Sequence, residues 1–170
     1  MASWLTSTAG YPYWLGINPQ PNPYGSFSSL ADQIVTGANT ATALTYTTTD
    51  IASQIYYSGS KIYVQATGVY RILYTVQMDT TSGGSQSVTV YIKKNGINIP
   101  NTASIFTIAN NAENIAACEI MVSMLAGDYV EVFMISSDAN MRAEYTAASG
   151  VAPNDVPAIP SIITVIQKIA

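Results

Sequence analysis

Apolar and polar side chains alternate most regularly between Asn114 and Ser137, on both sides of the tetrapeptide Leu125-Ala126-Gly127-Asp128. Alternation with a period of two around a Gly-Asp turn predicts two antiparallel strands joined as a hairpin. One row of this predicted hairpin is apolar throughout and should face a core: Ile120, Val122, Met124, Val130, Val132 and Met134.

The opposite row of the same predicted hairpin is not cleanly polar, because it includes Met121, Tyr129, Phe133 and Ile135. A strand with one solvated face in a monomer normally carries more charge on that face. We therefore expect this second row to pack against other copies of the chain.

A second long strand is predicted from Gly68 to Asp79. Its residues Tyr70, Ile72, Tyr74 and Val76 fall on one face, and Val69, Arg71, Leu73 and Thr75 fall on the other. The next predicted strand, Ser87–Lys94, points Val88, Val90 and Ile92 inward and Thr89, Tyr91 and Lys93 outward. It ends at Asn95-Gly96, which is the strongest two-residue hairpin turn in the sequence.

Shorter predicted strands fill most of the remaining chain: Phe27–Val35, Ala43–Thr47, Gln54–Tyr57, Lys61–Gln65, Thr102–Ala109, Met141–Tyr145 and Ile159–Ile169. The last of these carries Ile or Val on both faces, which predicts a place in the middle of a sheet. Residues 147–157 are small and include two prolines, so we expect a loop there. No stretch shows a sustained helical period, and about ten short strands predict an all-β sandwich, barrel or jelly roll.

Residues 1–26 differ from the rest, because they contain no charged side chain and are rich in proline and aromatic residues. The aromatic residues are Trp4, Tyr11, Tyr13, Trp14 and Tyr24. Proline at this density excludes a helix, and a solvated linker would be polar and poor in tryptophan. We expect an extended arm over residues 1–26, followed by one domain over residues 27–170. The rings of the arm either dock on a partner or cover the chain's own domain, and the sequence leaves both open.

The composition limits the possible partners and locations. The 170 residues suffice for one domain with a substantial core, and only 9% of them are charged. A net charge of -4 and a pI near 4.4 argue against nucleic acid as a partner. We also expect no signal peptide, no membrane-spanning segment and no membrane insertion. Such sparse charge suits a protein whose surface is largely covered in an assembly.

The residue types exclude most catalytic chemistry. The chain has no histidine and one cysteine, so a His-based triad and the usual zinc sites are excluded. Cys118 is expected to be a small buried apolar residue rather than a reactive thiol. Glu119 and Glu131 could pair as acid and base, but separate surface positions are favoured. Asp79, Asp138 and Asn140 could ligate calcium from two loops, although ordinary surface loops are again favoured. We therefore predict no catalytic residues, no cofactor and no metal.

Three fragments occur in an order known from one superfamily: Gly68-Val69-Tyr70 at a strand start, Lys93-Lys94-Asn95-Gly96 at a turn, and Leu125-Ala126-Gly127-Asp128-Tyr129-Val130 at another. Over roughly residues 27–169 the chain resembles the globular head of the C1q/TNF-like superfamily. The resemblance implies a ten-stranded jelly-roll sandwich that assembles as a homotrimer. It also implies a binding or structural role and not a catalytic one. We expect no collagen-like stalk or leader ahead of the domain, and its composition, rich in Ser, Thr and Asn, is similar to that of virion proteins of phages and large DNA viruses.

These expectations together favour a non-enzymatic virion protein, made in the host cytoplasm. It would be a trimeric minor capsid or decoration protein attached to the capsid shell through the aromatic residues of its N-terminal arm. The outward apolar residues Val69, Leu73, Tyr129, Phe133 and Ile135 would expose a larger patch than soluble monomers tolerate, so we predict that the trimer buries them. The alternative is a receptor- or glycan-binding head of a viral fibre or spike.

Overall fold

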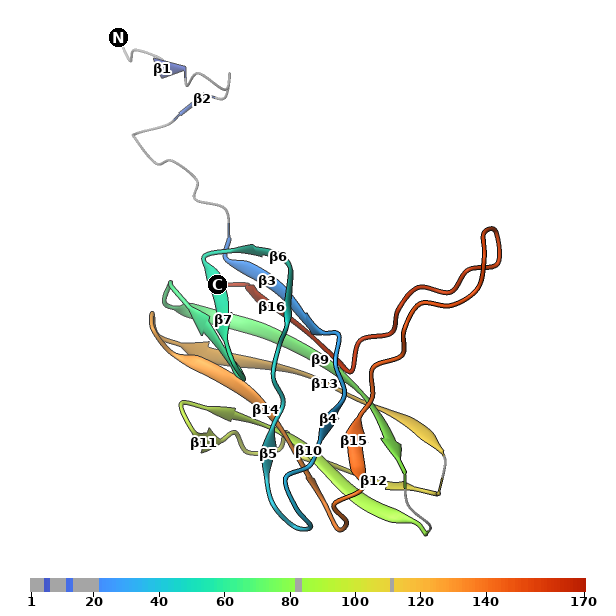
Figure 1. Cartoon of the computed structure of the whole chain (residues 1–170). Coiled ribbons are helices and arrows are strands. Elements are labelled where there is room, and N and C mark those ends of the chain that lie inside the picture. Colours follow the sequence, from blue (N-terminus) through green and yellow to red (C-terminus); the bar gives the residue numbers. More distant parts are fainter. Residues whose placement is uncertain (1–4, 7–11, 14–21, 82–83, 111) are drawn as a thin grey trace.

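The computed structural model describes residues 5–6, 12–13, 22–81, 84–110 and 112–170. Over these residues the protein is built of strands without any helix, as the alternation predicts. Two seven-stranded antiparallel sheets pack face to face as a sandwich (Figure 1). Among the described residues, no helix has the length and apolar character needed to cross a membrane.

The first sheet, called the β9 sheet here, is built around the longest strand. Its strands are β3 (Tyr24–Ser29), β4 (Gln33–Ile34), β6 (Thr48–Ser53), β9 (Gly68–Thr80), β13 (Glu113–Met124), β15 (Met141–Ala143) and β16 (Ile162–Lys168). Strand β9 pairs with β13 along one side and with β16 and β15 along the other. Strand β3 then joins β16 to β6, and β4 joins β15.

The second sheet, called the β14 sheet, consists of β5 (Thr42–Ala43), β7 (Ile55–Ser58), β8 (Lys61–Val64), β10 (Gln86–Lys94), β11 (Ile97–Asn98), β12 (Ser104–Ile108) and β14 (Tyr129–Ser136). Strands β10 and β14 pair in its centre, with β11 and β12 beyond β10 and with β5, β8 and β7 beyond β14. The predicted Asn95-Gly96 turn is confirmed between β10 and β11, and both residues have positive φ angles of 50° and 79°.

The core lies between the sheets, and the predicted inward rows form much of it. The inward side chains of β9 and β10 are all fully buried: Tyr70, Ile72, Tyr74, Val76, Val88, Val90 and Ile92. Phe27 from β3 is also fully buried and makes edge contacts with Tyr46 and Tyr57 at centroid distances of 6.3 and 5.6 Å. A Cβ atom at Gly25 would come within 2.6 Å of the Phe27 ring, so this position requires glycine.

The predicted hairpin over Asn114–Ser137 is wrong in its pairing. Strands β13 and β14 follow one another through Leu125–Asp128 but lie in different sheets, since β13 pairs with β9 and β14 pairs with β10. The predicted inward rows are still inward: Val130, Val132 and Met134 are buried, and Ile120 and Val122 pack against the core. The two apolar rows therefore face each other across the core instead of lying side by side.

The final strand is central, as its apolar residues on both faces predict, because β16 lies between β9 and β3. One of its faces is nevertheless open, and Val165 on that face is 41% exposed. The loop predicted over residues 147–157 is part of a two-stranded ribbon between β15 and β16, held by the bridges Thr146–Ile159 and Ser149–Val156. Figure 1 shows this ribbon extending well clear of the sandwich.

The arm predicted over residues 1–26 ends earlier than the sequence suggests. Tyr24 is the first residue of β3 and pairs with both β16 and β6, so it belongs to the sandwich. Lys168 also donates its backbone N–H to the carbonyl of Pro23. Further upstream, β1 (Leu5–Thr6) pairs with β2 (Pro12–Tyr13). The predicted anchors Trp4, Tyr11 and Trp14 lie outside the described residues.

Candidate interaction surfaces

Two of the motif turns singled out in the sequence interlock at one end of the sandwich. The Asn95 side chain donates to Asp128 Oδ1 at 2.7 Å and accepts from the Tyr129 backbone N–H at 2.9 Å. The second oxygen of Asp128 accepts from the Leu125 N–H at 2.8 Å and pairs with Lys94 Nζ at 3.0 Å. These contacts tie the end of the β14 sheet to the chain leaving β13.

Because of its contacts, the contribution of Asp128 to the stability of the fold depends on pH. The hydrogen bonds from Asn95 and Leu125, together with Lys94, lower the pKa of this carboxyl below its usual value. A carboxyl with a lowered folded-state pKa stabilises the fold above its unfolded pKa of about 3.9, and this contribution is lost as the pH falls. The turn is therefore a local source of acid sensitivity.

We expect Asp128→Ala to lower the free energy of unfolding by about 1–3 kcal/mol at neutral pH, because three donors lose their acceptor. The difference from the unaltered protein should shrink as the pH falls through the folded pKa of Asp128. Urea unfolding at neutral and acidic pH measures both effects. The control Asp155→Ala, on the exposed ribbon, should change stability by less than about 0.5 kcal/mol. Equal effects of the two substitutions would contradict the structural role of the turn.

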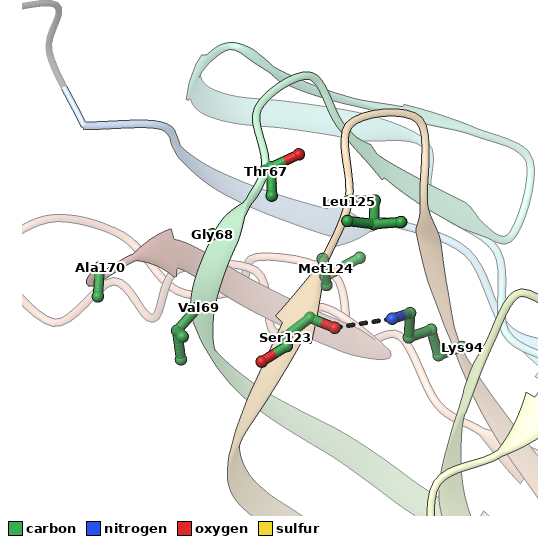
Figure 2. A pocket seen from close by; sticks show the side chains of 8 residues that line it. All are labelled: Thr67, Gly68, Val69, Lys94, Ser123, Met124, Leu125 and Ala170. Carbon is green, nitrogen blue, oxygen red and sulfur yellow. Dashed lines mark hydrogen bonds between the residues drawn. The ribbon is translucent and has the colours of Figure 1, made fainter.

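A hollow of about 400 Å³ lies beside these turns (Figure 2). Its lining residues are Thr67, Gly68, Val69, Lys94, Ser123, Met124, Leu125 and Ala170. A side chain at Gly68 would collide with Lys168 and with the backbone of Ala170, so this motif glycine permits the close approach of the end of β16. The one charged lining residue, Lys94, donates to the Ser123 carbonyl at 2.7 Å and pairs with Asp128. The walls of the hollow are therefore mostly apolar, and the ammonium group of Lys94 already has partners in Ser123 and Asp128.

The outer face of the β9 sheet carries a group of exposed apolar side chains among polar ones. The apolar side chains occupy outward positions on β6, β9, β13 and β16: Ile51, Val69, Leu73, Ile115, Met121 and Val165. Met121 and Ile115 are 69% and 60% exposed. Arg71 and Glu119 form an ion pair on this face at 2.7 Å, and Asp50 accepts from the outward hydroxyl groups of Ser26 and Ser28. The hydrogen bonds from Arg71 lower the pKa of the Glu119 carboxyl. Exposed apolar side chains gathered on one face are typical of an interaction surface.

The outer face of the β14 sheet is different, because it combines aromatic rings with lysines. Tyr56 stacks on Tyr63 at a centroid distance of 5.1 Å, and Tyr63 lies 5.3 Å from Tyr129. Lys61 Nζ lies 4.6 Å from the centre of the Tyr129 ring. On the other side of Glu131, Tyr91 stacks on Phe133 at 5.7 Å, and Lys93 Nζ lies 4.1 Å above the Phe133 ring.

The predicted trimer-interface residues do not form one surface. Val69 and Leu73 lie on the outer face of the β9 sheet, whereas Tyr129, Phe133 and Ile135 lie on the outer face of the β14 sheet. They are separated by the whole sandwich, because the predicted hairpin crosses between sheets. The same crossing puts Glu119 and Glu131 on opposite outer faces, so they cannot act as a pair of carboxylates.

The alternation marked Tyr129 and Phe133 as outward, but it did not show that Tyr56, Tyr63 and the two lysines join them. These residues lie on strands far apart in the sequence. The only sequence signal that could have identified them is that each is an aromatic or basic residue at an outward position of a short predicted strand.

The residues considered for calcium have other partners. Asp79 accepts from Arg142 at 2.9 Å, and the same guanidinium pairs with Asp32 at 3.0 Å and Glu144 at 2.7 Å. Asp138 accepts from Asn140 within its own loop. Burial raises the pKa of Glu144. In the part of the chain that the structure describes, no group of three or more His, Cys, Asp or Glu residues is arranged to hold a metal ion.

The single cysteine lies on the inward side of β13. Cys118 is half-buried and packs against the core beside Ile120 and Val122, as the alternation predicts. Burial raises the pKa of its thiol, which lowers the fraction present as thiolate. The environment is thus that of a packing residue.

Comparisons with known proteins identify the fold. No family model matches the sequence, and no curated protein matches it. Among solved structures, murine APRIL at pH 5.0 is 13% identical, with a TM-score of 0.56 over 87% of this chain and 99% of that chain. The globular domain of the zebrafish complement 1qA protein is also 13% identical, with a TM-score of 0.50 over 88% of this chain and 98% of that one. The chain therefore has the C1q/TNF-like jelly-roll fold, as the three sequence motifs predict.

Proposed function

We propose that the protein is a non-enzymatic homotrimeric jelly-roll module whose subunits meet through the outer face of the β9 sheet. The observation that supports this most is the group of exposed apolar side chains on that face, where Val165 and Met121 are 41% and 69% exposed. Burying apolar area yields about 25 cal/mol per Å², so a face of this kind favours association. A three-fold arrangement follows from the resemblance to the C1q/TNF-like superfamily.

The finer assignment is a virion protein, namely a minor capsid or decoration protein attached to the capsid shell. Two features of the sequence support it. Only 9% of the residues are charged, which suits a surface covered in an assembly. The N-terminal segment combines proline with tryptophan and tyrosine and has no charge, which suits docking on another protein.

We expect Val165→Asp to convert the trimer into monomers, because a carboxylate would be buried without a partner at the centre of the β9 sheet's outer face. Light scattering at micromolar concentration measures the change. The control Thr107→Asp places the same charge on exposed β12 of the other sheet and should leave the trimer intact. An unaltered protein that is a stable monomer would contradict the proposed assembly, and so would a Val165→Asp variant that remains a trimer.

A second candidate function is the receptor- or glycan-binding head of a viral fibre or spike. The observation that favours it is the row of tyrosines and lysines on the outer face of the β14 sheet, which the proposed trimer leaves free. Tyrosine combines an apolar ring with a polar tip and is therefore common at binding surfaces. An experiment can distinguish the two candidates, because the first predicts that the purified protein attaches to virus particles and the second predicts that it attaches to a cell surface.

A further inference from the structure

The geometry of the β14 sheet's outer face points to a binding site for acidic saccharides, with Lys61 and Lys93 as the anion-binding groups and the tyrosine row as the platform. This inference deepens the second candidate function and rests on it. It names both the face that binds and the chemical class of the ligand.

The first step of the argument concerns charge. Arg71, Lys94 and Arg142 all pair with carboxylates within 3.0 Å. Lys61 and Lys93 form no ion pair with any described residue; their ammonium groups lie instead over the rings of Tyr129 and Phe133. Lys168 also has no ion pair among the described residues, but it lies on the β9 sheet. The outer face of the β14 sheet therefore presents two unpaired cations together, and this makes it complementary to an anion.

The second step concerns the nearest carboxylate. Lys93 lies directly opposite Glu131 in the pairing of β10 with β14, yet its ammonium lies over the neighbouring ring. Glu131 is 7% exposed, and its Oε1 accepts from Ser60 Oγ at 2.7 Å. A cation over an exposed ring is held by only about 0.5–1 kcal/mol, so either lysine can turn to an incoming carboxylate or sulfate at little cost.

The third step concerns the platform of tyrosines on the β7 side of the sheet, which includes the strand of Lys61. Tyr56, Tyr63 and Tyr129 stand on three neighbouring strands, with ring centres 5.1 and 5.3 Å apart. None of their hydroxyl groups has a hydrogen-bond partner among the described residues. Tyr56 and Tyr63 are nearly parallel, whereas Tyr129 is inclined to Tyr63 by 50°. Their hydroxyl groups offer donors and acceptors for sugar hydroxyls, and the ring faces that no neighbouring ring covers offer apolar contacts for sugar C–H groups. This mixture suits a polyhydroxylated ligand better than an acidic peptide.

The test compares polymers that share one backbone: dextran, carboxymethyl dextran and dextran sulfate, with polyglutamate as an acid that is not a sugar. Fluorescence anisotropy of labelled polymer is measured with the full chain at low and high salt. We expect both acidic dextrans to bind and neutral dextran to bind at least about tenfold more weakly, with salt reducing the difference. Comparing the affinities for carboxymethyl dextran and dextran sulfate shows whether the lysines prefer a carboxylate or a sulfate.

The double variant Lys61→Gln/Lys93→Gln should bind acidic dextran at least about tenfold more weakly. Tyr63→Leu should lower affinity for acidic dextran while leaving polyglutamate binding unchanged. The control Lys168→Gln removes a charge from the other sheet and should bind like the unaltered protein. Thermal unfolding of each variant establishes that it is folded.

Several results would overturn the inference: no binding of acidic dextran, equal binding by the double lysine variant, or polyglutamate binding as tight as that of carboxymethyl dextran. The last result would mean that the face binds any polyanion and does not recognise the sugar. Light scattering on the same samples separates this inference from the proposed assembly. A trimer that does not bind refutes only the saccharide site, whereas a monomer that binds refutes only the trimer.

Discussion

Replacing Phe27 with alanine will lower the free energy of unfolding by about 3–5 kcal/mol, which is a large share of the stability of an ordinary domain. Phe27 is fully buried and contacts the rings of Tyr46 and Tyr57. Its removal leaves a cavity that the two sheets cannot close, because β3 is fixed on both sides by β16 and β6. Urea unfolding followed by tyrosine fluorescence measures the loss.

The matched control is Phe133→Ala, which removes the same side chain from the outer face of the β14 sheet. Phe133 is only partly buried and contacts Tyr91 and Lys93, so we expect its loss to cost less than about 2 kcal/mol. If the two substitutions cost the same, then the assignment of Phe27 to the core and Phe133 to the surface is wrong. Light scattering on both variants also reports whether Phe133 affects the proposed assembly.

The direction in which a strand's side chains point could be predicted from the sequence. Tyr70, Ile72 and Tyr74 alternate with Val69, Arg71 and Leu73, and the structure buries the first set and leaves the second outward. The reason is local, because successive side chains of a strand must point to opposite faces. The Asn95-Gly96 turn could be predicted for the same reason, since only a few residue types adopt positive φ at both positions.

The choice of pairing partner could not be predicted, because it depends on residues far away in the chain. Leu125–Asp128 can close a hairpin or carry the chain from one sheet to the other, and alternation on its two sides looks the same in both cases. In the structure the chain crosses because β13 pairs with β9 and β14 pairs with β10, and Asn95 and Lys94 from β10 and its turn contact Asp128 at the crossing. The predicted interface therefore mixed Leu73 of one face with Phe133 of the opposite face.

The surface of the β14 sheet was missed for a related reason. Tyr56, Tyr63 and Tyr129 become neighbours only through the pairing of β7 with β8 and of β8 with β14. The sequence shows each as an outward aromatic residue, and nothing local says that three such residues align. Their alignment also changes what Lys61 does, because its ammonium lies over one of these rings.

On the proposed function, we expect deletion of residues 1–21 to abolish attachment to particles and to leave the proposed trimer intact. The cut is placed before Asn22 because Pro23 bonds to Lys168 and β3 begins at Tyr24, so a cut at Ser26 would remove part of the β9 sheet. The deleted segment contains both tryptophans of the chain. Such anchors often contribute about 2 kcal/mol or more each at interfaces, and proline reduces the entropy lost on docking.

In the proposed trimer three segments would act together, so their loss should reduce attachment by far more than the affinity of one segment. The measurement is co-sedimentation of the truncated trimer with particles purified from the source that encodes the chain. Trp14→Ala should weaken co-sedimentation and leave thermal unfolding unchanged, whereas the control Ser7→Ala should change neither. If the truncated protein loses its fold, the segment covers its own domain and the attachment proposal fails. If it folds and still joins particles normally, attachment runs through the sandwich, and the outer face of the β14 sheet, the proposed saccharide site, becomes the next surface to alter.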